Sequence, residues 1–422
     1  MLEVFTKRKK EIFFFLLLIL FFYRSPYIFL NGRFMAEEGN VFFKYAYLNN
    51  FFSSLFFIDF FSGYINLWAN ISAILSNMFS LKFAPIVSNY LSLVPKLIII
   101  IYSLNRDNLL LNKFYLNAVF VLIIFISPLN VPEIWMNSIN SQIFFAMLVF
   151  FLVFIKYDNS RYNIVDAFIL FISGLTGIYS CILLPIFILK FYLFKAKQDY
   201  LNLIVLGICT LFQFAIVIYS KFSNSLYEGK LHSVNPELIV NFTYNVLIKS
   251  FLGTDLTKYI YNNFLININL SLISLIIILI FAANIFLFLN HLKKIFLKNK
   301  EIKLILIATL YAFISTSILV LIGGTGDYVG GRYAALPSFY FLVFFIIIIK
   351  LSKIKFLKYL SLFLLTSSIF FGAVSFKNND YSQYLQCQNC PNWLNEIKKF
   401  DQDKTYPMKI WPYPNKTMQL TN

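Results

Sequence analysis

The sequence is short of the residues on which most soluble enzymes build a catalytic or metal site. It has only two histidines, His232 and His291, and four cysteines among its 422 residues. The histidines lie far apart in the topology predicted below, so a histidine-based metal site or catalytic triad has little support. No Walker A motif, dinucleotide-binding glycine pattern or HExxH motif occurs at a workable position.

Acidic residues are also scarce, since 19 Asp and Glu stand against 36 Lys and Arg, for a net charge of +17. Such an excess can suggest nucleic acid as a partner, but the basic residues lie mostly in short loops between apolar runs. The chain is 59% hydrophobic and 20% aromatic, with a mean hydropathy of +0.72. A soluble domain of this length cannot bury that much apolar surface. The composition therefore predicts an all-α polytopic membrane protein without a nucleic-acid partner.

Apolar runs predict about eleven membrane-spanning helices. The basic residues cluster on one side of these spans when the N-terminus is cytoplasmic, as the positive-inside rule requires, and the C-terminus is then extracytoplasmic. The first run follows a basic segment but precedes no cleavage site, so it is interpreted as a retained helix. The predicted spans are 11–30, 84–104, 113–128, 138–156, 164–177, 178–195, 200–220, 269–291, 302–322, 336–350 and 356–375.

One further apolar run, 63–79, is expected not to cross the membrane. If it crossed, every later loop would invert and the clustered basic residues would fall outside. Its asparagines and serines suit a juxtamembrane or re-entrant helix on the outer side, where they can face protein or the interface. The stretch 164–195 is interpreted as a hairpin that turns at 174–177, with one long helix as the alternative.

This topology brings the outer segments together on one face of a transmembrane domain, residues 1–376. A small extracytoplasmic tail, residues 377–422, lies on the same side. The converging segments are 31–82, 129–139, 221–268 and 323–335.

The first outer segment contains an adjacent acidic pair, Glu37 and Glu38. Two carboxylates at a bilayer surface can bind a divalent cation such as Mg²⁺ or Mn²⁺, or one of them can act as a base. They also suit the solvated start of a helix, because acids are favoured at helix N-termini.

The last outer loop is rich in glycine and ends in Gly330-Gly331-Arg332-Tyr333. Glycines let backbone amides approach a ligand and form an anion-binding nest, and the Arg332 guanidinium suits phosphate. A flexible loop with a snorkelling arginine is the alternative. Because arginine is rare in this chain, the phosphate-binding interpretation is favoured.

The second outer loop supplies further polar candidates, Glu133, Asn137 and Asn140. The two asparagines are spaced i, i+3, so they are expected to share one helix face at the outer boundary and to face a cavity. Helix capping is the competing interpretation for Asn137. Within the second span, Lys96 is either a buried lysine that serves a lipid phosphate or a lysine that snorkels toward the cytoplasm, which is favoured because it lies nearer the inner end.

Two of the cysteines, Cys387 and Cys390, form a CxxC pattern in the outer tail. Without a second cysteine or histidine pair nearby, zinc is not indicated. A disulfide in an oxidising compartment is expected instead. Cys181 and Cys209 fall in spans and are interpreted as packing residues.

An acidic pair in the first outer loop, a juxtamembrane helix after it, many spans and an extracytoplasmic tail together resemble the GT-C superfamily of polytopic glycosyltransferases. Glu37-Glu38 occupies the place of that family's Asp/Glu motif, and Gly63-Tyr64 onward looks like its juxtamembrane helix. Glu133 resembles the second-loop acid of several members. The Arg332-Tyr333 loop and the tail segment 410–414 look like features of bacterial members.

The resemblance implies a hexosyl- or pentosyltransferase in the bacterial inner membrane. Its donor would be a polyprenyl-phosphate-linked sugar, and its acceptor a glycan, lipid or protein on the extracytoplasmic face. Glu37 would be the base, with Glu38 as support or cation ligand, and Arg332 with the glycine loop would bind the donor phosphate. Asn137 and Asn140 would contact the sugar, on which Trp411 or Tyr413 would stack.

Two other classes remain open at this point. A transporter or flippase for lipid-linked glycans predicts charged residues deep in several spans and internal symmetry. An O-antigen polymerase or ligase is also polytopic, and it usually relies on a large late outer loop with arginines and a histidine. The segment 221–268 contains His232 but no arginine.

Overall fold

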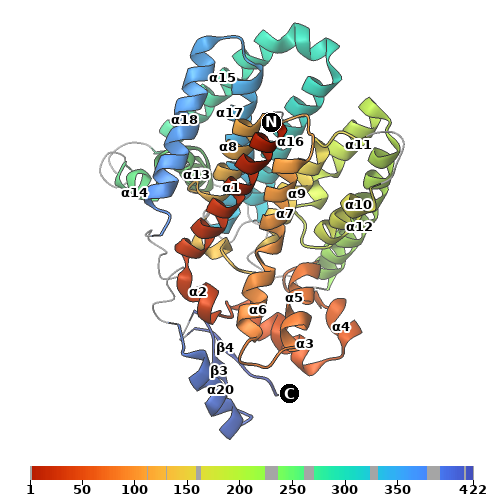
Figure 1. The fold of residues 1–422 in the computed structure, drawn as a ribbon, viewed down its shortest axis with the longest axis vertical. Coiled ribbons are helices and arrows are strands. Elements are labelled where there is room, and N and C mark those ends of the chain that lie inside the picture. The colour runs from red at the N-terminus through yellow and green to blue at the C-terminus, as the bar shows by residue number, and fades with distance from the viewer. Residues whose placement is uncertain are drawn as a thin grey trace.

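The structure is a computed structural model of the chain, and it describes residues 2–111, 113–129, 131–157, 163–223, 236–260, 270–323, 331–377, 390–412 and 415–421. It is a helical bundle with short elements at one end (Figure 1). Within the described residues, five helices are long and apolar enough to cross a membrane. These are Ala84–Asn105, Lys197–Phe222, Lys300–Ile322, Arg332–Leu351 and Lys355–Val374. The chain is therefore a helical membrane protein, whereas the count of eleven spans stays a prediction.

Long and medium helices form the bundle. They are α1 (Leu2–Arg24), α6 (Ala84–Leu91), α7 (Val94–Asn105), α8 (Phe114–Phe125), α9 (Ser141–Val153), α10 (Ile164–Gly174), α11 (Leu184–Phe194), α12 (Lys197–Phe222), α15 (Leu270–Lys298), α16 (Lys300–Gly323), α17 (Arg332–Leu351) and α18 (Lys355–Val374).

Shorter elements connect and cap the bundle. They are α2 (Pro26–Asn31), η1 (Glu38–Phe43), α3 (Lys44–Leu48), α4 (Phe51–Leu55), β1 (Ile58–Asp59), β2 (Tyr64–Ile65), α5 (Leu67–Asn77), η2 (Pro132–Ile134), η3 (Cys181–Leu183), α13 (Pro236–Phe242), η5 (Thr243–Ile248), α14 (Lys249–Ile260), α20 (Trp393–Gln402), β3 (Met408–Lys409) and β4 (Thr417–Met418). The strands pair antiparallel as β1–β2 and β3–β4.

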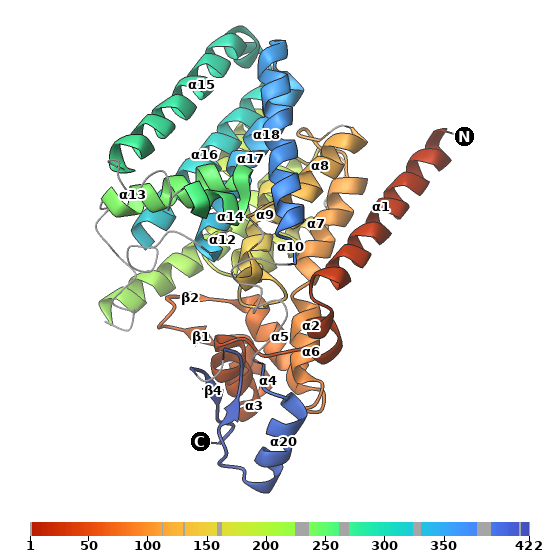
Figure 2. The same ribbon diagram turned by 90° about the vertical axis from the view of Figure 1, so that its left-hand side faces the viewer.

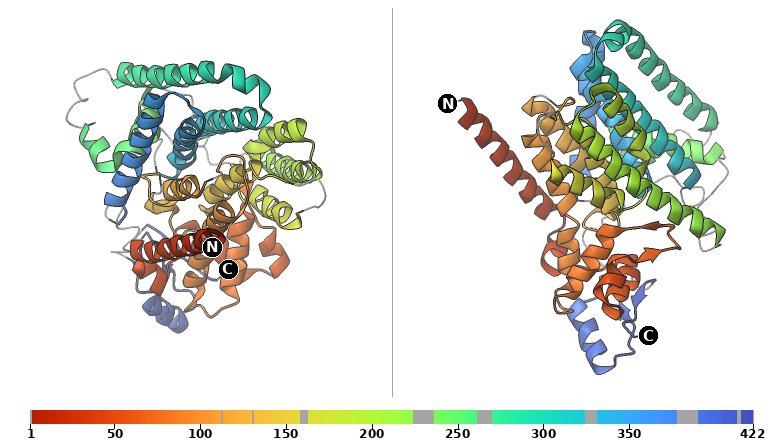
Figure 3. Two further views of the ribbon diagram at one scale, coloured as in Figure 1. Left: turned by 45° about the horizontal axis from the view of Figure 1, so that its top comes forward. Right: turned by 90° about the vertical axis from the view of Figure 1, so that its right-hand side faces the viewer.

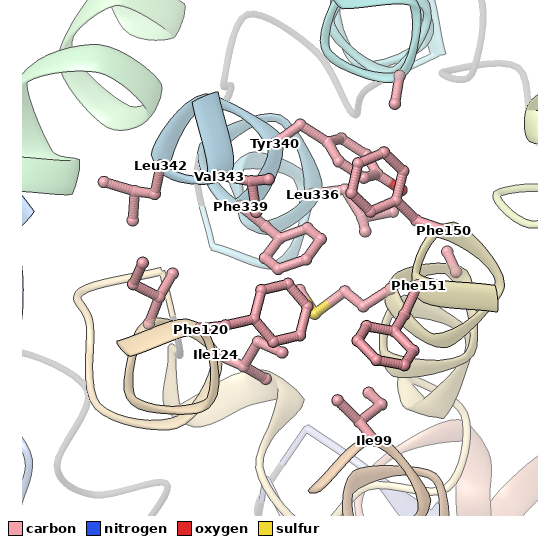
Figure 4. Close-up of a cluster of buried hydrophobic side chains, with 14 of the residues drawn as sticks. Ile99, Phe120, Ile124, Phe150, Phe151, Leu336, Phe339, Tyr340, Leu342 and Val343 are labelled. Atoms are coloured by element: carbon pink, nitrogen blue, oxygen red, sulfur yellow. The ribbon is translucent and has the colours of Figure 1, made fainter. Parts of the chain in front are cut away.

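The centre of the bundle is formed by α8, α9 and α17. Every residue of α9 is buried, as expected for a helix that is apolar on all sides. Aromatic rings fill the space between the three helices (Figure 4). The ring centroids of Phe120 and Phe339 lie 5.7 Å apart and those of Phe150 and Tyr340 lie 4.8 Å apart, both edge to face. By contrast, α18 exposes large apolar side chains such as Phe363 and Phe370, as a lipid-facing helix does.

The two chain termini lie at opposite ends of the bundle (Figures 1 and 2). At the end away from the tail, ion pairs and hydrogen bonds join helix ends to one another and to the connecting segments. Lys156 Nζ lies 3.1 Å from Glu301, and Lys190 Nζ lies 3.0 Å from Asp199. Lys350 donates to the Leu110 carbonyl at 3.1 Å. Lys156, Lys190 and Lys350 thus share one end of the bundle, as predicted, while the side of the membrane that this end faces stays a prediction.

The predicted turn at 174–177 is confirmed. The helix α10 ends at Gly174 and α11 begins at Leu184. The amide of Asn163, before α10, donates to Gln198 Oε1 at 2.6 Å, and Gln213 Nε2 donates to the Gly174 carbonyl at 3.3 Å. Because these bonds join α12 to both ends of α10, the two helices run in the same direction and α11 returns between them.

The run 63–79 forms the end of the β1–β2 hairpin and then α5, a helix of 11 residues. At 1.5 Å per residue this helix is roughly 16 Å long, too short to cross a bilayer. Its asparagines bond to protein, as expected. Asn66 Oδ1 accepts from the Ala69 amide at 3.2 Å and so caps the helix, and Asn70 Nδ2 donates to the Phe57 carbonyl at 2.9 Å.

The tail packs directly on the first outer segment rather than standing apart from it. Met35 pairs with Trp411 in a parallel bridge, and the Ala36 amide donates to the Trp411 carbonyl at 2.7 Å. The Trp393 indole donates to the Leu81 carbonyl at 2.9 Å, and its ring packs against Phe34. The described tail residues, 390–412 and 415–421, and the first outer segment therefore share one small core at the end of the bundle, where Figure 2 shows α20, β4 and α3 together.

The cysteines agree with the sequence analysis where they are described. Cys181 and Cys209 are free and buried, as packing residues are. Cys390 is disulfide-bonded, and its expected partner Cys387 lies outside the described residues.

Candidate functional site

The second outer loop, residues 131–141, connects the outer segments to one another. The Asn66 side chain donates to the Ile139 carbonyl at 3.0 Å, and Asn89 donates to the Met136 carbonyl at 2.9 Å. Met136 adopts a φ of 47°, an uncommon conformation for a side chain without a local hydrogen-bonding group. These bonds fix the loop against both α5 and α6, so its polar residues have defined positions.

Glu38 joins this loop to the acidic segment. It is 2% exposed, and its carboxylate accepts from the Met35 amide at 3.1 Å, the Ser138 amide at 2.7 Å, the Ser138 hydroxyl at 2.7 Å and the Ser88 hydroxyl at 3.2 Å. Burial raises the pKa of Glu38, although these hydrogen bonds and the nearby charge of Arg33 oppose the shift. A carboxylate enclosed in this way positions the loops and does not reach solvent.

Glu37 has the opposite environment. Its side chain is 44% exposed, and Oε1 lies 3.2 Å from Lys416 Nζ in the tail. The expected cation site requires both carboxylates to face one ligand. In the structure they face different partners, Lys416 for Glu37 and Ser138 for Glu38. Among the described residues there is also no group of three or more His, Cys, Asp or Glu side chains that could hold a metal ion.

Arg332 pairs with Glu133 at this end of the bundle. Arg332 Nη1 lies 3.3 Å from Glu133 Oε1, with the side chains 36% and 30% exposed. The Arg332 amide donates to Glu133 Oε2 at 3.3 Å. Gly331 allows this approach, because it adopts a φ of 55° and a Cβ there would lie 2.7 Å from Glu133 Oε2. The sequence pointed to Arg332 as a free phosphate ligand, whereas the structure gives it a carboxylate partner.

Most of the glycine nest expected beside Arg332, Gly330 included, lies outside the described residues, which omit 324–330. Tyr333 lies at the start of α17, where its hydroxyl accepts from Arg332 Nη2 at 3.2 Å. This contact helps to hold the guanidinium next to Glu133.

The prediction that Asn137 and Asn140 share a helix face is wrong, because α9 begins only at Ser141. Asn137 Oδ1 accepts from the amides of Ile139 and Asn140, at 2.9 Å and 3.3 Å, so it closes a turn ahead of α9. It does not cap the helix, whose N-cap residue is Asn140. Asn140 donates to the Glu133 carbonyl at 3.1 Å. Both asparagines are buried, and they shape the loop that presents Glu133.

Trp411 and Lys96 differ from their expected settings. Trp411 is 4% exposed, and the Arg33 guanidinium carbon lies 5.0 Å from its ring centroid, so its ring is covered in this structure. Tyr413 lies outside the described residues. Lys96 does not snorkel, because its side chain turns into the core, where Nζ lies 4.2 Å from the Phe144 ring centroid and donates to the Ser92 carbonyl at 3.3 Å.

Sequence reasoning missed several residues of this region. Gln142 Nε2 donates to the Tyr64 hydroxyl at 3.2 Å. Burial raises the pKa of Tyr64, and the Gln142 hydrogen bond and the charge of Arg332 oppose the shift. Gly177 makes room for Gln142, since a Cβ at Gly177 would lie 2.0 Å from Gln142 Oε1. Gly177, in the predicted turn, was the available sequence signal for a close contact. The sequence did not show that the side chain in contact is Gln142.

Comparison of the chain with protein-family models, with curated proteins and with solved structures gives no match.

Proposed function

We propose that this chain is a GT-C-type membrane glycosyltransferase of the bacterial inner membrane. It moves a hexose or pentose from a polyprenyl-phosphate donor to a glycan, lipid or protein acceptor on the extracytoplasmic face. Support for its placement in a membrane comes from the five long apolar helices. The reaction itself is the proposal.

One observation carries the proposal. Two partly exposed carboxylates, Glu37 and Glu133, lie at the same end of the bundle, and the buried carboxylate of Glu38 fastens the segments that carry them. A transferase of this kind needs a carboxylate that takes the acceptor proton and a cation near the departing phosphate. Glu37 meets the first need because it is accessible, and Arg332 meets the second.

The enclosed setting of Glu38 gives it a positioning role in this proposal rather than a role as cation ligand. Its hydrogen bonds to Ser138 and Ser88 hold the first outer segment against the second loop and α6. Glu37 directly precedes Glu38 in the chain, so fixing Glu38 also keeps the Glu37 carboxylate at this end of the bundle, beside Lys416.

The test is a donor-swap assay with the full chain in membranes that contain defined lipid-linked sugars. Transfer from one of these donors that is lost in Glu37→Gln and kept in Glu301→Gln supports the proposal. Glu301 is the matched control because it is an accessible, lysine-paired carboxylate at the other end of the bundle. Absence of transfer from every polyprenyl-phosphate sugar, with a folded protein, refutes it.

A second candidate is a transporter or flippase for lipid-linked glycans, and buried charges favour it. Lys96 is fully buried beside Phe144, and the Lys190–Asp199 pair is nearly so. Charged groups inside a membrane protein often mark a transport path. Movement of a fluorescent lipid-linked sugar across proteoliposomes without any sugar transfer would favour this candidate over the transferase.

A further inference from the structure

Large aromatic side chains are exposed where the first outer segment meets the end of α12. Phe52 in α4 is 73% exposed, Phe56 directly after α4 is 61% exposed, and Phe60 in the turn between β1 and β2 is 38% exposed. Tyr219 and Phe222, at the end of α12, are 61% and 83% exposed. We call these five residues the aromatic edge. Exposed apolar side chains that gather in one region mark a contact with protein or membrane.

The turn that carries Phe60 is closed by hydrogen bonds. The amides of Ser62 and Gly63 both donate to the Asp59 carbonyl at 3.0 Å, and the Ser62 hydroxyl donates to the Asp59 carboxylate. Gly63 adopts a φ of 76°, which a residue with a side chain rarely does. The turn therefore has a defined shape, and Phe60 keeps a fixed place at its tip.

The β1–β2 hairpin is fastened along α12. The buried side chain of Gln213 accepts from the Ile65 amide at 3.1 Å and donates to the Ile65 carbonyl at 3.0 Å. Nearer the end of α12, the ring centroids of Phe60 and Tyr219 lie 5.3 Å apart. Leu55, at the end of α4, packs on the apolar cluster between the hairpin and α12. The hairpin therefore reaches outward beside the last turns of α12 (Figures 2 and 3).

The end of α12 sets the depth of the aromatic edge in the membrane. This helix has 26 residues and is one of the five able to cross a bilayer. At roughly 39 Å it is longer than the ~30 Å hydrocarbon core. Its outward side exposes Leu211 and Ile218, whereas its last turn contains Tyr219 and the exposed Lys221. Tyrosine and lysine are typical of the membrane–water boundary, and Phe60, which contacts Tyr219, lies at the same depth.

We propose that the aromatic edge inserts into the membrane beside α12, at the boundary between lipid head groups and acyl chains. The lipid-facing side of α12 continues into the edge through the Phe60–Tyr219 contact, so the bilayer that covers one also covers the other. Rings placed there leave water, as the apolar faces of interfacial elements do, and Lys221 can extend to the head groups. This proposal does not depend on the transferase function, because it concerns only a contact with lipid.

The test places a nitroxide spin label on Phe60→Cys and on Phe52→Cys in the full chain, reconstituted as one chain per phosphatidylcholine nanodisc. Collisions with oxygen, which concentrates in lipid, are compared with collisions with a nickel chelate, which stays in water. We expect the oxygen-to-nickel ratio at both positions to exceed that of the control roughly threefold or more, because the label lies in the interface rather than in water. The control is Leu394→Cys, an exposed apolar position on α20 in the tail.

Two results overturn the proposal. A ratio at either position equal to that of Leu394→Cys places that part of the edge in water. Shielding of either label from both oxygen and the nickel chelate places it under protein, as a contact with another part of the chain would. If Phe60→Cys does not fold, Phe56→Cys takes its place and is judged by the same ratio. The native Cys181 and Cys209 are buried and should take up little label.

Discussion

Ser138 holds Glu38 through two hydrogen bonds, one from its backbone amide and one from its hydroxyl, each 2.7 Å long. The two residues are 100 positions apart in the chain. Glu38 follows directly on the residue proposed as the base, and Ser138 belongs to the loop that presents Glu133. This contact therefore sets the distance between the two accessible carboxylates of the candidate site.

The first prediction concerns the stability that this contact gives. Glu38→Gln places an amide NH₂ among groups that all donate, so we expect a loss of about 1–3 kcal/mol in the free energy of unfolding. Ser138→Ala removes only the hydroxyl and should cost about 0.5–1.5 kcal/mol. Thermal unfolding in detergent measures both. Glu11→Gln, at an exposed position near the middle of α1, is the control, and an equal cost there would contradict the role of Glu38.

The second prediction concerns Glu37 as the base. Glu37→Gln keeps the size of the side chain but removes the proton acceptor, so transfer should fall by ~10²-fold or more. Folding should survive, because a partly exposed ion pair such as Glu37–Lys416 contributes at most about 1 kcal/mol. Lys416→Gln breaks the same pair and keeps the carboxylate, so it should retain most of the activity. Near-normal turnover in Glu37→Gln would rule out this base and leave Glu133 to examine.

The third prediction is a loss of tail packing in acid. Burial raises the pKa of Glu396, but hydrogen bonds from the Lys409 amide, the Tyr406 hydroxyl and Lys399 outweigh burial and hold it below its ordinary value of 4.5. The unfolded state then binds more protons in acid, so the stability from Glu396 is present above pH 4.5 and is lost as pH falls through the lowered pKa.

The fluorescence of Trp393, which packs against Phe34, reports this loss of packing. The chain should show a change below pH 4.5 that reverses on neutralisation. In Glu396→Gln the titratable group is gone, so the change attributable to it should be absent. The same acid transition in both proteins would show that another group is responsible.

The helical architecture could be predicted from the sequence because it depends on local composition. The turn at Gly174 and the short helix α5 follow from glycine placement and from polar residues inside an apolar run. Charge in the loops predicted that outer segments converge, and the structure shows this for the first outer segment, the second loop, Arg332 and the tail. Predicting these features requires no knowledge of which distant residues contact one another.

The partners within the site could not be predicted, because they depend on contacts between distant segments. Arg332 and Glu133 are 199 positions apart. The sequence suggested that each of them binds substrate, and it gave no sign that they pair with each other. The spacing of Asn137 and Asn140 fits a helix face, but the local chain forms a turn because Asn137 closes it. Lys96 turns inward because aromatic rings of α9 and its preceding loop accept the ammonium group.

The fourth prediction concerns topology. Lys82 and Lys113 are both exposed, one before α6 and the other before α8. Since α5 is too short to cross, a cysteine at Lys82 should react with an impermeant reagent from outside the cell, and one at Lys113 only after the membrane is opened. The native Cys181 and Cys209 are buried and should give little background. Labelling of position 113 from outside would invert the whole orientation.

The last prediction addresses the Glu133–Arg332 pair. If the guanidinium binds the departing phosphate, its fork holds two oxygens at once. Arg332→Lys keeps the charge but loses the fork, so it should retain part of the activity, and Arg332→Ala should retain much less. Turnover and donor affinity, measured in detergent at fixed ionic strength, separate these outcomes.

Glu133→Gln distinguishes a phosphate site from a purely structural pair. Removing the carboxylate frees the guanidinium, so donor affinity should hold or rise if Arg332 binds phosphate. If the pair only anchors α17 to the second loop, Glu133→Gln and Arg332→Ala should lower stability alike. Neither should then change donor affinity, and combining them should add little further loss, because either change alone breaks the same contact. That pattern would remove Arg332 from the donor site.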